Sequence, residues 1–415
     1  MTAKKESDFL KKYALIKPGV FDMTHLYADL AEYEEKPRHY SGRRNQMRVT
    51  MGQIIRRQYF VVRKAGFGVS SVTWLCYDKK AKDFVVLKIL RNHEQDEQEL
   101  KILKDIAEMD SEESQHFVKY LAHFQLKRIH TCIVFEPLGC TLRTAMNRQW
   151  SFAWPVVKKL LNHMLKALSL LNFDLNILHG DIKPENILVK CSKRSFFLET
   201  LNVVRAGYKG PGMNAACSSM MDIASGSKNY YKRIVGQCPA PEGGTIDNDD
   251  GQNFVRLLLH ESTLFKLCDV GNAQEYGECQ HNVATYEYRT PENVFRLPLT
   301  DSADIWSLAM TSIEALTGEG VIPYKEDDNE NLLQGIVNLL GNYDKDIFTS
   351  PGYYYDVQPS TAKGSTPEEN IAIHLRENKI DDTTIAAAVP IFAPMLIYDR
   401  RVRYNAKKML RLFDI

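Results

Sequence analysis

The sequence predicts an α+β fold in which a small strand-rich part precedes a larger, mainly helical part. Short apolar runs at 59–64, 72–77 and 84–90 fit strands, and one helix-like segment, 94–106, follows them. A strongly amphipathic segment at 160–171 fits a buried-face helix that opens the second part. With 415 residues the chain exceeds the usual size of one core, so one large two-lobed domain or two domains are expected.

The composition excludes several classes of protein. A chain with 44% hydrophobic and 25% charged residues fits the soluble globular class. The net charge of +1 argues against direct nucleic-acid binding, and no stretch approaches the ~20 apolar residues of a membrane span. The N-terminus lacks an apolar signal core, and the eight cysteines show no C-x-x-C spacing. We therefore expect reduced thiols, no zinc, no membrane partner and a cytoplasmic or nuclear location.

Two segments lack the regular pattern of the rest. Residues 1–57 are expected to form an N-terminal extension in which 22–33 fits a short amphipathic helix. Its arginine pairs suit acidic partners, although a solvated arm is the more usual interpretation. Residues 192–262 are rich in Gly, Pro, Ser and Asn, and loops of this length are uncommon inside a compact domain. They are predicted to be an inserted spacer.

A polar loop between two apolar runs carries the residues best suited to chemistry. Ile177-Leu178 leads into this loop and Ile187-Leu188-Val189 leads away from it, so buried strands are expected on both sides. A carboxylate, an ammonium group and an amide stand within it, at Asp181, Lys183 and Asn186. The set suits phosphoryl transfer, because the carboxylate accepts a hydroxyl proton, the ammonium neutralises the phosphoryl group and the amide oxygen binds a metal. On these residues alone, a solvated surface turn is the alternative.

Two glycines between strands suggest a phosphate-binding loop. Gly66 and Gly68 allow the backbone to approach phosphates closely and to present its N–H groups. A strand follows these glycines, whereas the dinucleotide-binding fingerprint requires a helix at that point. An ordinary hairpin turn explains the same residues, so Gly-x-Gly alone is a weak signal.

Two further charged residues follow apolar runs in a suggestive way. Lys88 lies inside the buried strand at 84–90, and a lysine there needs a carboxylate or phosphate partner. Glu94, Glu97 and Glu99 in the next helix are each possible carboxylate partners. Asp269 ends a later apolar run and is followed, two residues on, by a glycine that can adopt a positive φ. Taken singly, such an Asp-x-Gly is usually a turn.

The order of these motifs across residues 59–410 resembles that of eukaryotic protein kinases. The loop at 178–189 resembles the kinase catalytic loop, and Lys183 after Asp181 matches its serine/threonine-specific version. The resemblance implies the two-lobed protein kinase fold: a small β-rich N-lobe with one main helix over 58–137, and a larger mainly helical C-lobe over 138–415. It also implies ATP and Mg²⁺ as cofactors.

The resemblance implies a role for each matching residue. Glu99 is chosen as the partner of Lys88 because the sequence around it matches the kinase helix best, and Ser71 stands where the glycine-rich loop often has a third glycine. Phe135 matches the bulky gatekeeper before the hinge. The implied catalytic residues are Asp181, Lys183 and Lys88, the implied ATP-binding residues are Gly66, Gly68, Ser71, Lys88, Glu99, Glu136 and Leu138, and the implied Mg²⁺ ligands are Asn186 and Asp269.

Three structural residues also match the kinase pattern. Thr290-Pro291-Glu292 stands for the usual Ala-Pro-Glu at the end of the activation segment. Arg403 is the expected buried partner of Glu292, because a buried carboxylate needs one. Asp304 is expected to brace the backbone of the catalytic loop.

Within the kinases, the chain resembles the SR-protein kinases of the CMGC group. The catalytic loop His-Gly-Asp-Ile-Lys-Pro-Glu-Asn, the sequence Asp-Val-Gly-Asn-Ala at 269–273 and the position of the spacer are similar to that family's. The resemblance implies protein substrates rich in Arg/Ser and a monomeric enzyme. An acidic cluster, Glu326, Asp327, Asp328 and Glu330, is expected either to dock arginine-rich substrates or to be a solvated loop.

The chain also departs from the kinase pattern. Gly180 replaces the arginine that binds an activation-loop phosphate in many kinases, so we expect activity without loop phosphorylation. Val86 stands where most kinases have a small alanine over the adenine, and Thr73 replaces a valine beside it. The two extra methyl groups of Val86 are expected to narrow the adenine site. Two alternatives therefore stay open: a CMGC kinase of other specificity and a pseudokinase-type binding module.

Overall fold

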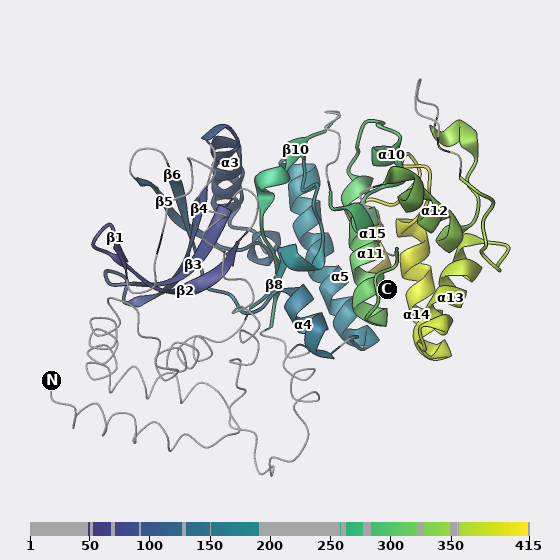
Figure 1. The fold of residues 1–415 in the computed structure, drawn as a ribbon, viewed down its shortest axis with the longest axis horizontal. Coiled ribbons are helices and arrows are strands. Elements are labelled where there is room, and N and C mark those ends of the chain that lie inside the picture. The colour runs from purple at the N-terminus through teal and green to yellow at the C-terminus, as the bar shows by residue number, and fades with distance from the viewer. Residues whose placement is uncertain are drawn as a thin grey trace, which may run out of the picture. The chain divides into compact units, whose positions relative to one another are not determined.

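The computed structural model describes residues 49, 53–67, 71–90, 93–126, 130–149, 151–190, 258, 263–276, 284–322, 328–348, 355 and 357–413. The chain forms two compact units (Figure 1). The strand unit contains the described residues before 92 and Leu121–Gly139, and the helical unit contains His93–Tyr120, Cys140–Lys190 and the described residues from 255 onward. The predicted helix at 22–33 and the spacer at 192–262, apart from Leu258, lie outside the described residues.

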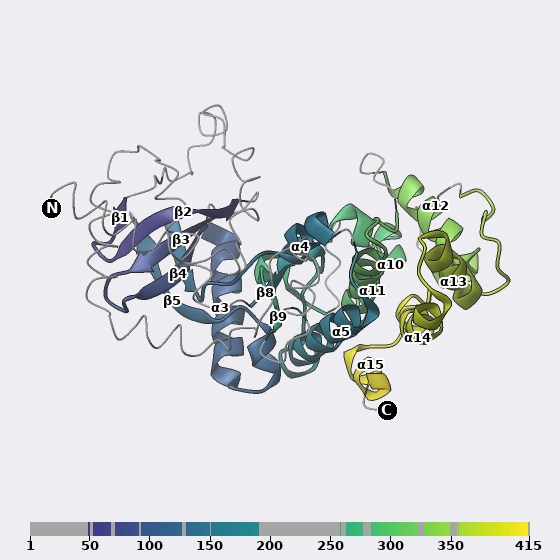
Figure 2. The ribbon, with the colours of Figure 1, turned by 90° about the horizontal axis from the view of Figure 1, so that it is seen from below.

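The strand unit is built on a six-stranded sheet of order β1-β2-β3-β4-β6-β5, seen as a curled sheet in Figures 1 and 2. Neighbouring strands from β1 to β6 pair antiparallel. The strands are β1 (Ile54–Ile55), β2 (Tyr59–Phe67), β3 (Ser71–Asp78), β4 (Asp83–Leu90), β5 (Tyr120–Leu126) and β6 (His130–Phe135). The three strands predicted at 59–64, 72–77 and 84–90 are confirmed as β2, β3 and β4, with β2 extending beyond the predicted run and through Gly66.

The two faces of this sheet differ because successive strand residues point to opposite sides. Trp74, Leu87 and Val134 are buried in one hydrophobic cluster on the first face. Thr73 and Lys88 alternate with them and pair directly with each other across β3 and β4. Burying each aliphatic core side chain contributes roughly 1.5–3 kcal/mol, which fixes the register and hence the face on which Lys88 lies.

The helical unit contains the remaining described elements. Its α-helices are α3 (His93–Met109), α4 (Leu142–Gln149), α5 (Trp154–Ser169), α10 (Pro291–Val294), α11 (Ser302–Thr317), α12 (Asn329–Leu340), α13 (Pro367–Glu377), α14 (Asp382–Phe392) and α15 (Ala406–Phe413). Its short strands are β7 (Ile177–Leu178), β8 (Ile187–Val189), β9 (Phe265–Leu267) and β10 (Gln274–Glu275). None of the described helices is both long and apolar enough to cross a membrane.

Helices α5 and α11 lie side by side at the centre of this unit (Figures 1 and 2). The predicted apolar face of α5 is confirmed, since Leu160, Leu161, Met164, Leu165 and Leu168 are all buried. The predicted helical run to 171 ends instead in a π-helical turn, η4 (Leu170–Asp174). In α11 every residue from Ser302 to Leu316 is buried, as expected for a helix surrounded by others.

Helix α3 confirms the helix predicted at 94–106 and extends beyond it at both ends. Within the helical unit it contacts η3 (Glu113–His116) and η6 (Val270–Asn272). Gln98 Nε2 donates a hydrogen bond of 3.0 Å to the carbonyl oxygen of Ala273. These contacts place α3 against the segment that carries Asp269.

Candidate active site

The loop that carries Asp181 is held between two pairs of short strands. Strand β7 before it pairs with β10, and strand β8 after it pairs with β9. Ile177, Leu178, Ile187 and Val189 are buried, which confirms the predicted apolar flanks. A short 3₁₀ turn, η5 (Pro184–Asn186), returns the chain to β8. The backbone of the loop is therefore fixed at both ends.

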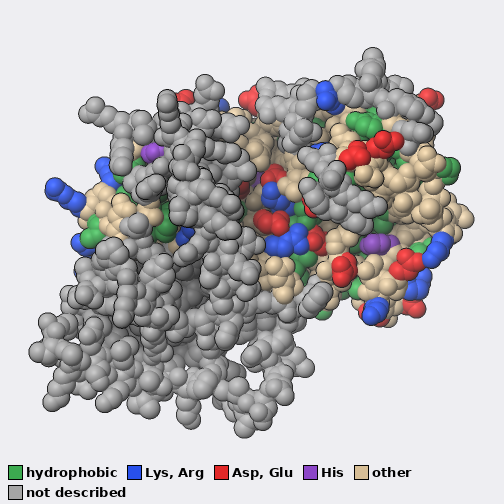
Figure 3. All heavy atoms as spheres, in the orientation of Figure 1, with side chains coloured by type: hydrophobic (Ala, Val, Ile, Leu, Met, Phe, Trp, Pro, Cys, Tyr) green, Lys and Arg blue, Asp and Glu red, His purple; other side chains and the backbone are tan. Residues whose placement is uncertain are grey.

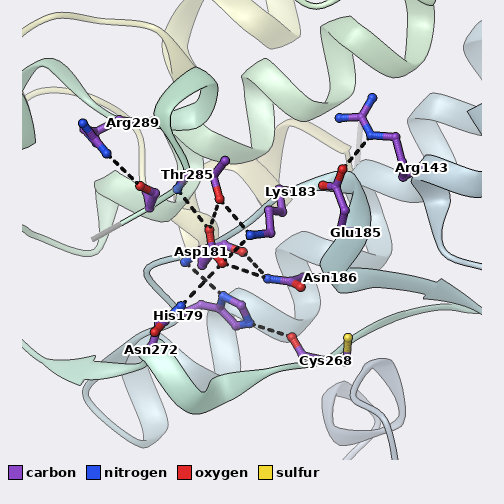
Figure 4. Close-up of polar contacts among 11 residues, drawn as sticks. Arg143, His179, Asp181, Lys183, Glu185, Asn186, Cys268, Asn272, Thr285 and Arg289 are labelled. Atoms are coloured by element: carbon purple, nitrogen blue, oxygen red, sulfur yellow. Dashed lines mark hydrogen bonds and ion pairs between the residues drawn. The ribbon is translucent and has the colours of Figure 1, made fainter. Parts of the chain in front are cut away.

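The carboxylate of Asp181 is the centre of a polar cluster (Figure 4). Its Oδ2 lies 2.7 Å from Lys183 Nζ and accepts from Asn186 Nδ2 at 3.2 Å. Its Oδ1 accepts from both the hydroxyl and the backbone N–H of Thr285, at 2.8 and 3.1 Å. Lys183 Nζ also donates to Thr285 Oγ1 at 2.7 Å. The structure thus brings together three predicted site residues, Asp181, Lys183 and Asn186, with Thr285.

Burial and charge act on Asp181 in opposite directions. Its side chain is only 5% exposed, and burial by itself raises the pKa of a carboxyl group. The positive charge of Lys183 and the hydrogen bonds from Lys183 and Thr285 outweigh burial, so the pKa of Asp181 lies below its usual value. The ionised form is the one able to accept a proton from a hydroxyl group.

The backbone before Asp181 is held by Asp304 from α11, as predicted. Asp304 Oδ2 accepts from the N–H of His179 and Oδ1 accepts from the N–H of Gly180, both at 2.9 Å. Asn172 Nδ2 also donates to Asp304, at 3.3 Å. Burial raises the pKa of Asp304, and these donors oppose that effect. Gly180 has a φ of 77°, a left-handed conformation that suits the glycine found there.

His179 connects this loop to the segment before Asp269. Its Nδ1 accepts from the N–H of Asp181 at 3.3 Å, so Nε2 carries the proton and donates to the carbonyl oxygen of Cys268 at 3.0 Å. The N–H of Cys268 in turn donates to the carbonyl oxygen of Asn186 at 2.9 Å. Asp269 therefore lies directly beside the loop that carries Asn186.

The backbone at Asp269 differs from the prediction. Asp269 itself is left-handed, with φ 64° and ψ 64°, and Gly271 is not among the glycines of positive φ. A Cβ on Gly271 would lie 3.4 Å from Asp269 Oδ1 and 3.4 Å from Glu99 Oε2. The carboxylates of Asp269 and Glu99 thus both lie close to Gly271, and a side chain there would only just fit between them. The ion pair between Lys88 and Glu99 stays a prediction.

In the strand unit, the predicted nucleotide-site residues follow one row across the sheet. Gly66 pairs with Thr73, Thr73 pairs with Lys88, and Lys88 pairs with Ile133. Lys88 is 7% exposed, as expected for a lysine with a partner. Ser71 is buried at the first position of β3, and Gly68 lies outside the described residues.

The predicted hinge follows β6 directly. Phe135 ends this strand and pairs with Val86 of β4. The predicted gatekeeper, Phe135, and the residue predicted to narrow the adenine site, Val86, are therefore neighbours on one face of the sheet. Leu138 is buried and Glu136 is half-buried in the irregular backbone that follows. The roles of Glu136 and Leu138 in nucleotide binding stay predictions.

The ion pair expected between Glu292 and Arg403 is confirmed. Arg403 Nη1 and Nη2 bond the two carboxylate oxygens of Glu292 at 2.7 and 2.9 Å, and both side chains are fully buried. Thr290, at the position of the usual alanine, caps α10, since its Oγ1 accepts from the N–H of Asn293 at 3.1 Å.

Only half of the predicted acidic docking cluster lies in the described part of the chain. Asp328 caps α12, because its Oδ1 accepts from the N–H of Glu330 at 2.9 Å and its Oδ2 accepts from Asn331 Nδ2 at 2.8 Å. Its carboxylate therefore has a structural role. Glu330 is exposed, and Glu326 and Asp327 lie outside the described residues.

Sequence reasoning assigned no role to several residues of this site. Thr285 touches both Asp181 and Lys183 but belongs to none of the motifs in the sequence. Arg143 was not singled out, yet it bonds Glu185 of the catalytic loop and Glu314 of α11 (Figure 4 shows the bond to Glu185). These contacts join residues far apart in the sequence.

Comparison with known families decides the classification of this fold and site. The family model described as "Protein kinase domain" matches residues 59–209 and 254–411. The chain belongs to the protein kinase family. The match contains strands β2 to β6 of the strand unit, the catalytic loop and Asp269, so the α+β kinase fold predicted from the motif order is confirmed.

Curated relatives of this kinase have names of the SRPK type. It is 28% identical over 316 residues to "Serine/threonine-protein kinase SRPK" of Physarum polycephalum, covering 72% of this chain and 71% of the relative. It is 27% identical over 383 residues to "Protein kinase dsk1" of Schizosaccharomyces pombe, covering 72% and 69%. It is 29% identical over 216 residues to "SRSF protein kinase 3" of Sus scrofa, covering 49% and 38%. The chain is thus a serine/threonine protein kinase similar to the SRPK family at modest identity.

Proposed function

We propose that this kinase transfers the γ-phosphate of ATP, bound with Mg²⁺, to serine or threonine hydroxyl groups of Arg/Ser-rich proteins. The observation that carries this proposal is the buried carboxylate of Asp181, which Lys183 and Thr285 keep ionised. A solvated surface turn would not explain why Asp181, which is only 5% exposed, has donors from Lys183, Asn186 and Thr285 around its carboxylate. The surface-turn alternative for this loop therefore loses its support.

Each charged residue has a chemical role in the proposed reaction. Asp181 orients the acceptor hydroxyl group and accepts its proton. Lys183 lies 2.7 Å from Asp181, so its ammonium group stands where the negative charge of the transferred phosphoryl group is neutralised. Lys88 would position the α- and β-phosphates. None of these groups is replaced by an uncharged residue, which argues against a pseudokinase-type module.

The residues beside Asp181 suit a magnesium ion bound with the nucleotide. Asn186 turns its Nδ2 toward Asp181, at 2.8 Å from the carbonyl oxygen, so its amide oxygen lies on the opposite side. Asp269 follows β9 and is joined to the Asn186 backbone through Cys268. Mg²⁺ prefers oxygen ligands and commonly takes one or two from the protein and others from phosphates. Asn186 and Asp269 would hold the ion, which supplies charge neutralisation on the phosphates.

The substrate class is proposed from the relatives and from the sequence motifs. One relative is named as the kinase SRPK and another as an SRSF protein kinase. The catalytic loop and the sequence Asp-Val-Gly-Asn-Ala of this chain are similar to those of the SRPK family. Substrates of this class agree with the predicted cytoplasmic or nuclear location. We also propose that the kinase acts as a monomer. The domain boundaries, with the N-lobe at 58–137 and the C-lobe at 138–415, stay as predicted from the sequence.

Transfer of radiolabelled phosphate from ATP to an Arg/Ser peptide tests the proposal. The wild-type kinase should label the peptide, and Asp181→Ala should lose most of this activity while still binding ATP. Binding of ATP without transfer by the wild type would instead establish a binding module. Labelling of other peptides in an array, but not of Arg/Ser peptides, would establish a CMGC kinase of different specificity.

A further inference from the structure

Two turns at one end of the six-stranded sheet are bonded to each other. Residues 56–58 connect β1 to β2, and residues 79–82 connect β3 to β4. The N–H of Lys79 donates to the carbonyl oxygen of Gln58 at 3.1 Å, and Gln58 Nε2 donates to both carboxylate oxygens of Asp78, at 3.0 and 2.9 Å. These bonds cross from one hairpin to the other, so each turn holds its neighbour in place.

This end of the sheet carries exposed positive charge. Five cationic side chains are exposed there and are called the basic tip: Arg56, Arg57, Lys79, Lys80 and Lys82. In the part of the chain that the structure describes, none of the five forms an ion pair. Figure 3 shows Lys and Arg side chains projecting at the left margin, where β1 lies in Figure 1. The pair Arg56-Arg57, which suits acidic partners by its sequence, thus belongs to a larger basic surface.

The two carboxylates beside the basic tip do not cancel its charge. Asp78 is 7% exposed and also accepts from the N–H groups of Lys80 and Ala81, at 2.8 and 3.1 Å. Asp83 is half-buried and accepts from the N–H of Phe84 at 2.9 Å. Both carboxylates bond the backbone of the turn and its flanking strand. Even with both of them ionised, the basic tip keeps an excess of positive charge.

Three members of the basic tip have a backbone conformation that long side chains disfavour. Arg56, Arg57 and Lys82 have φ values of 51°, 60° and 54°, in the left-handed region. Glycine and asparagine adopt this region at a lower cost in free energy than arginine or lysine do. Folding alone would therefore favour glycine or asparagine at these positions. The presence of three cations there indicates that their charge serves another purpose.

The side chains around the basic tip discriminate among anionic partners. The guanidinium group of Arg56 lies 4.9 Å from the centroid of the Phe124 ring, and that ring stacks on Tyr59 at 5.4 Å. Phe124 and Tyr59 are only 6% and 5% exposed, so neither ring can stack with the bases of a single-stranded nucleic acid. Beside Arg56, Ile54 is 45% exposed, and one aliphatic side chain offers little apolar area to a membrane surface. These side chains favour a polypeptide partner.

We propose that the basic tip binds an acidic polypeptide segment, a run of Asp or Glu residues on a partner protein. The two arginines bind carboxylates through their planar forks, and the three lysines add compact positive charges. The bonds between the turns hold the backbone of the tip in place, so the loss of conformational freedom on binding is small. The binding is independent of the proposed function, because no member of the basic tip has a role in phosphoryl transfer.

The basic tip lies at the opposite end of β2 from the predicted phosphate loop. Strand β2 runs over nine residues, from Tyr59 to Phe67. At ~3.3 Å per residue, the strand separates Arg57 from Gly66 by roughly 25–30 Å. An acidic segment bound at the tip therefore leaves Gly66 uncovered.

Fluorescence anisotropy of a labelled oligoglutamate peptide, with the whole kinase, tests this binding. The wild type should bind the peptide, and Arg57→Gln/Lys80→Gln/Lys82→Gln should raise Kd roughly tenfold, because three exposed charge interactions are lost. Added salt should weaken binding to the wild type, since exposed charges are screened. Absence of binding to the wild type, or an unchanged Kd in the triple variant, would overturn the proposal.

The matched control is Lys407→Gln/Lys408→Gln/Arg411→Gln, which removes two lysines and one arginine from exposed positions on α15. It changes the net charge of the kinase by the same amount as the triple variant of the tip does. Its Kd for the peptide should equal that of the wild type. An equal increase of Kd in both triple variants would indicate general charge attraction and overturn the proposal.

The single variant Arg57→Asn provides a test that does not depend on folding of the triple variant. Asparagine accepts a φ of 60° more readily than arginine does, so Tm should not decrease. Kd for the peptide should still rise roughly two- to threefold, because one charge is lost. An unchanged Kd in this variant would contradict the role of the tip.

Two other probes in the same assay identify the class of partner. Single-stranded RNA and vesicles that contain phosphatidylserine should bind more weakly than oligoglutamate. Tighter binding of either probe, lost in the triple variant of the tip, would assign the surface to nucleic acid or membrane and overturn the proposal. Phosphate transfer to a short Arg/Ser peptide should be equal in the wild type and this variant, so failure of the proposed reaction leaves the binding result intact.

Discussion

Thr285 is the residue through which the activation segment reaches the proposed proton acceptor. Its hydroxyl group donates to Asp181 at 2.8 Å and accepts from Lys183 at 2.7 Å. One side chain thus fixes the orientation of both the carboxylate and the ammonium group. The aliphatic part of Thr285 makes no comparable contribution, so the effect of the residue should depend on the hydroxyl group.

We predict that Thr285→Val lowers kcat roughly 10- to 100-fold, because Asp181 and Lys183 lose their common partner and shift from their working positions. Thr285→Ser keeps the hydroxyl group and should retain activity near that of the wild type. Steady-state kinetics with a peptide substrate measure both values, and KM for ATP should change little. Equal activity of the valine and serine variants would contradict this role.

At the scale of elements, α11 holds three parts of the site together. Asp304 bonds the backbone before Asp181, and Ser307 Oγ donates to the carbonyl oxygen of Tyr288 at 2.7 Å. Glu314, near the other end of the helix, bonds Arg143 and Tyr288. The helix is buried along its length, so these anchors do not move independently.

The buried ion pair between α10 and the segment before α15 should matter much more than an exposed pair nearby. Arg403→Leu leaves the carboxylate of Glu292 buried without its partner and should lower the free energy of unfolding by about 3–5 kcal/mol. Arg401→Ala removes the bond to Asp399 from a side chain that is 72% exposed, and should cost less than about 1 kcal/mol. Urea denaturation of both variants checks this difference. Similar losses in the two variants would disprove it.

Two neighbouring histidines, one buried and one half-buried, should make the helical unit sensitive to acid. The ring centroids of His116 and His163 lie 4.5 Å apart, with the rings tilted by 32°. Burial, aided by the positive charge of Lys166, lowers the pKa of His116 to about 4, and burial with the charge of His116 lowers that of His163 to about 3. Because both folded pKa values lie below the unfolded value of about 6.5, the unfolded state binds more protons and stability falls as the pH drops through this range.

We predict that the urea midpoint of the wild type decreases steadily from pH 7 to pH 4. His116→Phe keeps the ring contact and removes one titrating group, so its midpoint should decrease less over the same range. Equilibrium denaturation at several pH values measures both slopes. A variant with the same slope as the wild type would show that His116 does not titrate on unfolding.

The sequence was a good guide wherever a local pattern determines the structure. Short apolar runs predicted the strands around Lys88, and helical spacing predicted the buried face of α5. The need of a buried carboxylate for a partner predicted the Glu292–Arg403 pair. For Asp328 the sequence left open a docking carboxylate or a solvated loop residue, and neither interpretation included the helix cap, which depends on where α12 begins.

Contacts between distant segments were beyond such reasoning. The hydroxyl group of Thr285 meets Asp181 across 104 positions, and Arg143 meets Glu314 across 171. The positive φ was expected at Gly271, because glycine has the highest propensity for it, but the structure has it at Asp269. The sequence does not show that the carboxylates of Asp269 and Glu99 lie close to Gly271. In each case the packing of whole elements determines the local outcome.

At the scale of the whole molecule, the residues predicted from the sequence to bind the nucleotide occur in both compact units. Lys88 belongs to the strand unit, whereas Asp181, Asn186 and Asp269 belong to the helical unit. A ligand that binds only the folded protein stabilises it according to its concentration relative to Kd. ATP with Mg²⁺ should therefore protect the kinase as a whole against heating.

We predict that ATP with Mg²⁺ at ~100 times Kd raises Tm by roughly 5 °C. Lys88→Met should abolish most of this increase, because the phosphates lose their cationic partner. Removal of Mg²⁺ with EDTA should reduce the increase in the wild type as well. Differential scanning fluorimetry measures each shift, with the Tm of the nucleotide-free variant as control. An undiminished shift in Lys88→Met would exclude Lys88 from the nucleotide site.

The close approach of Thr73 to Gly66 links the residues that these two positions can hold. A Cβ at position 66 would lie 2.9 Å from Thr73 Oγ1, inside the contact distance of the two atoms. A side chain at 66 therefore requires the hydroxyl group of Thr73 to move or Thr73 to be exchanged for a smaller residue. Substitutions at 66 should thus depend on which residue stands at 73.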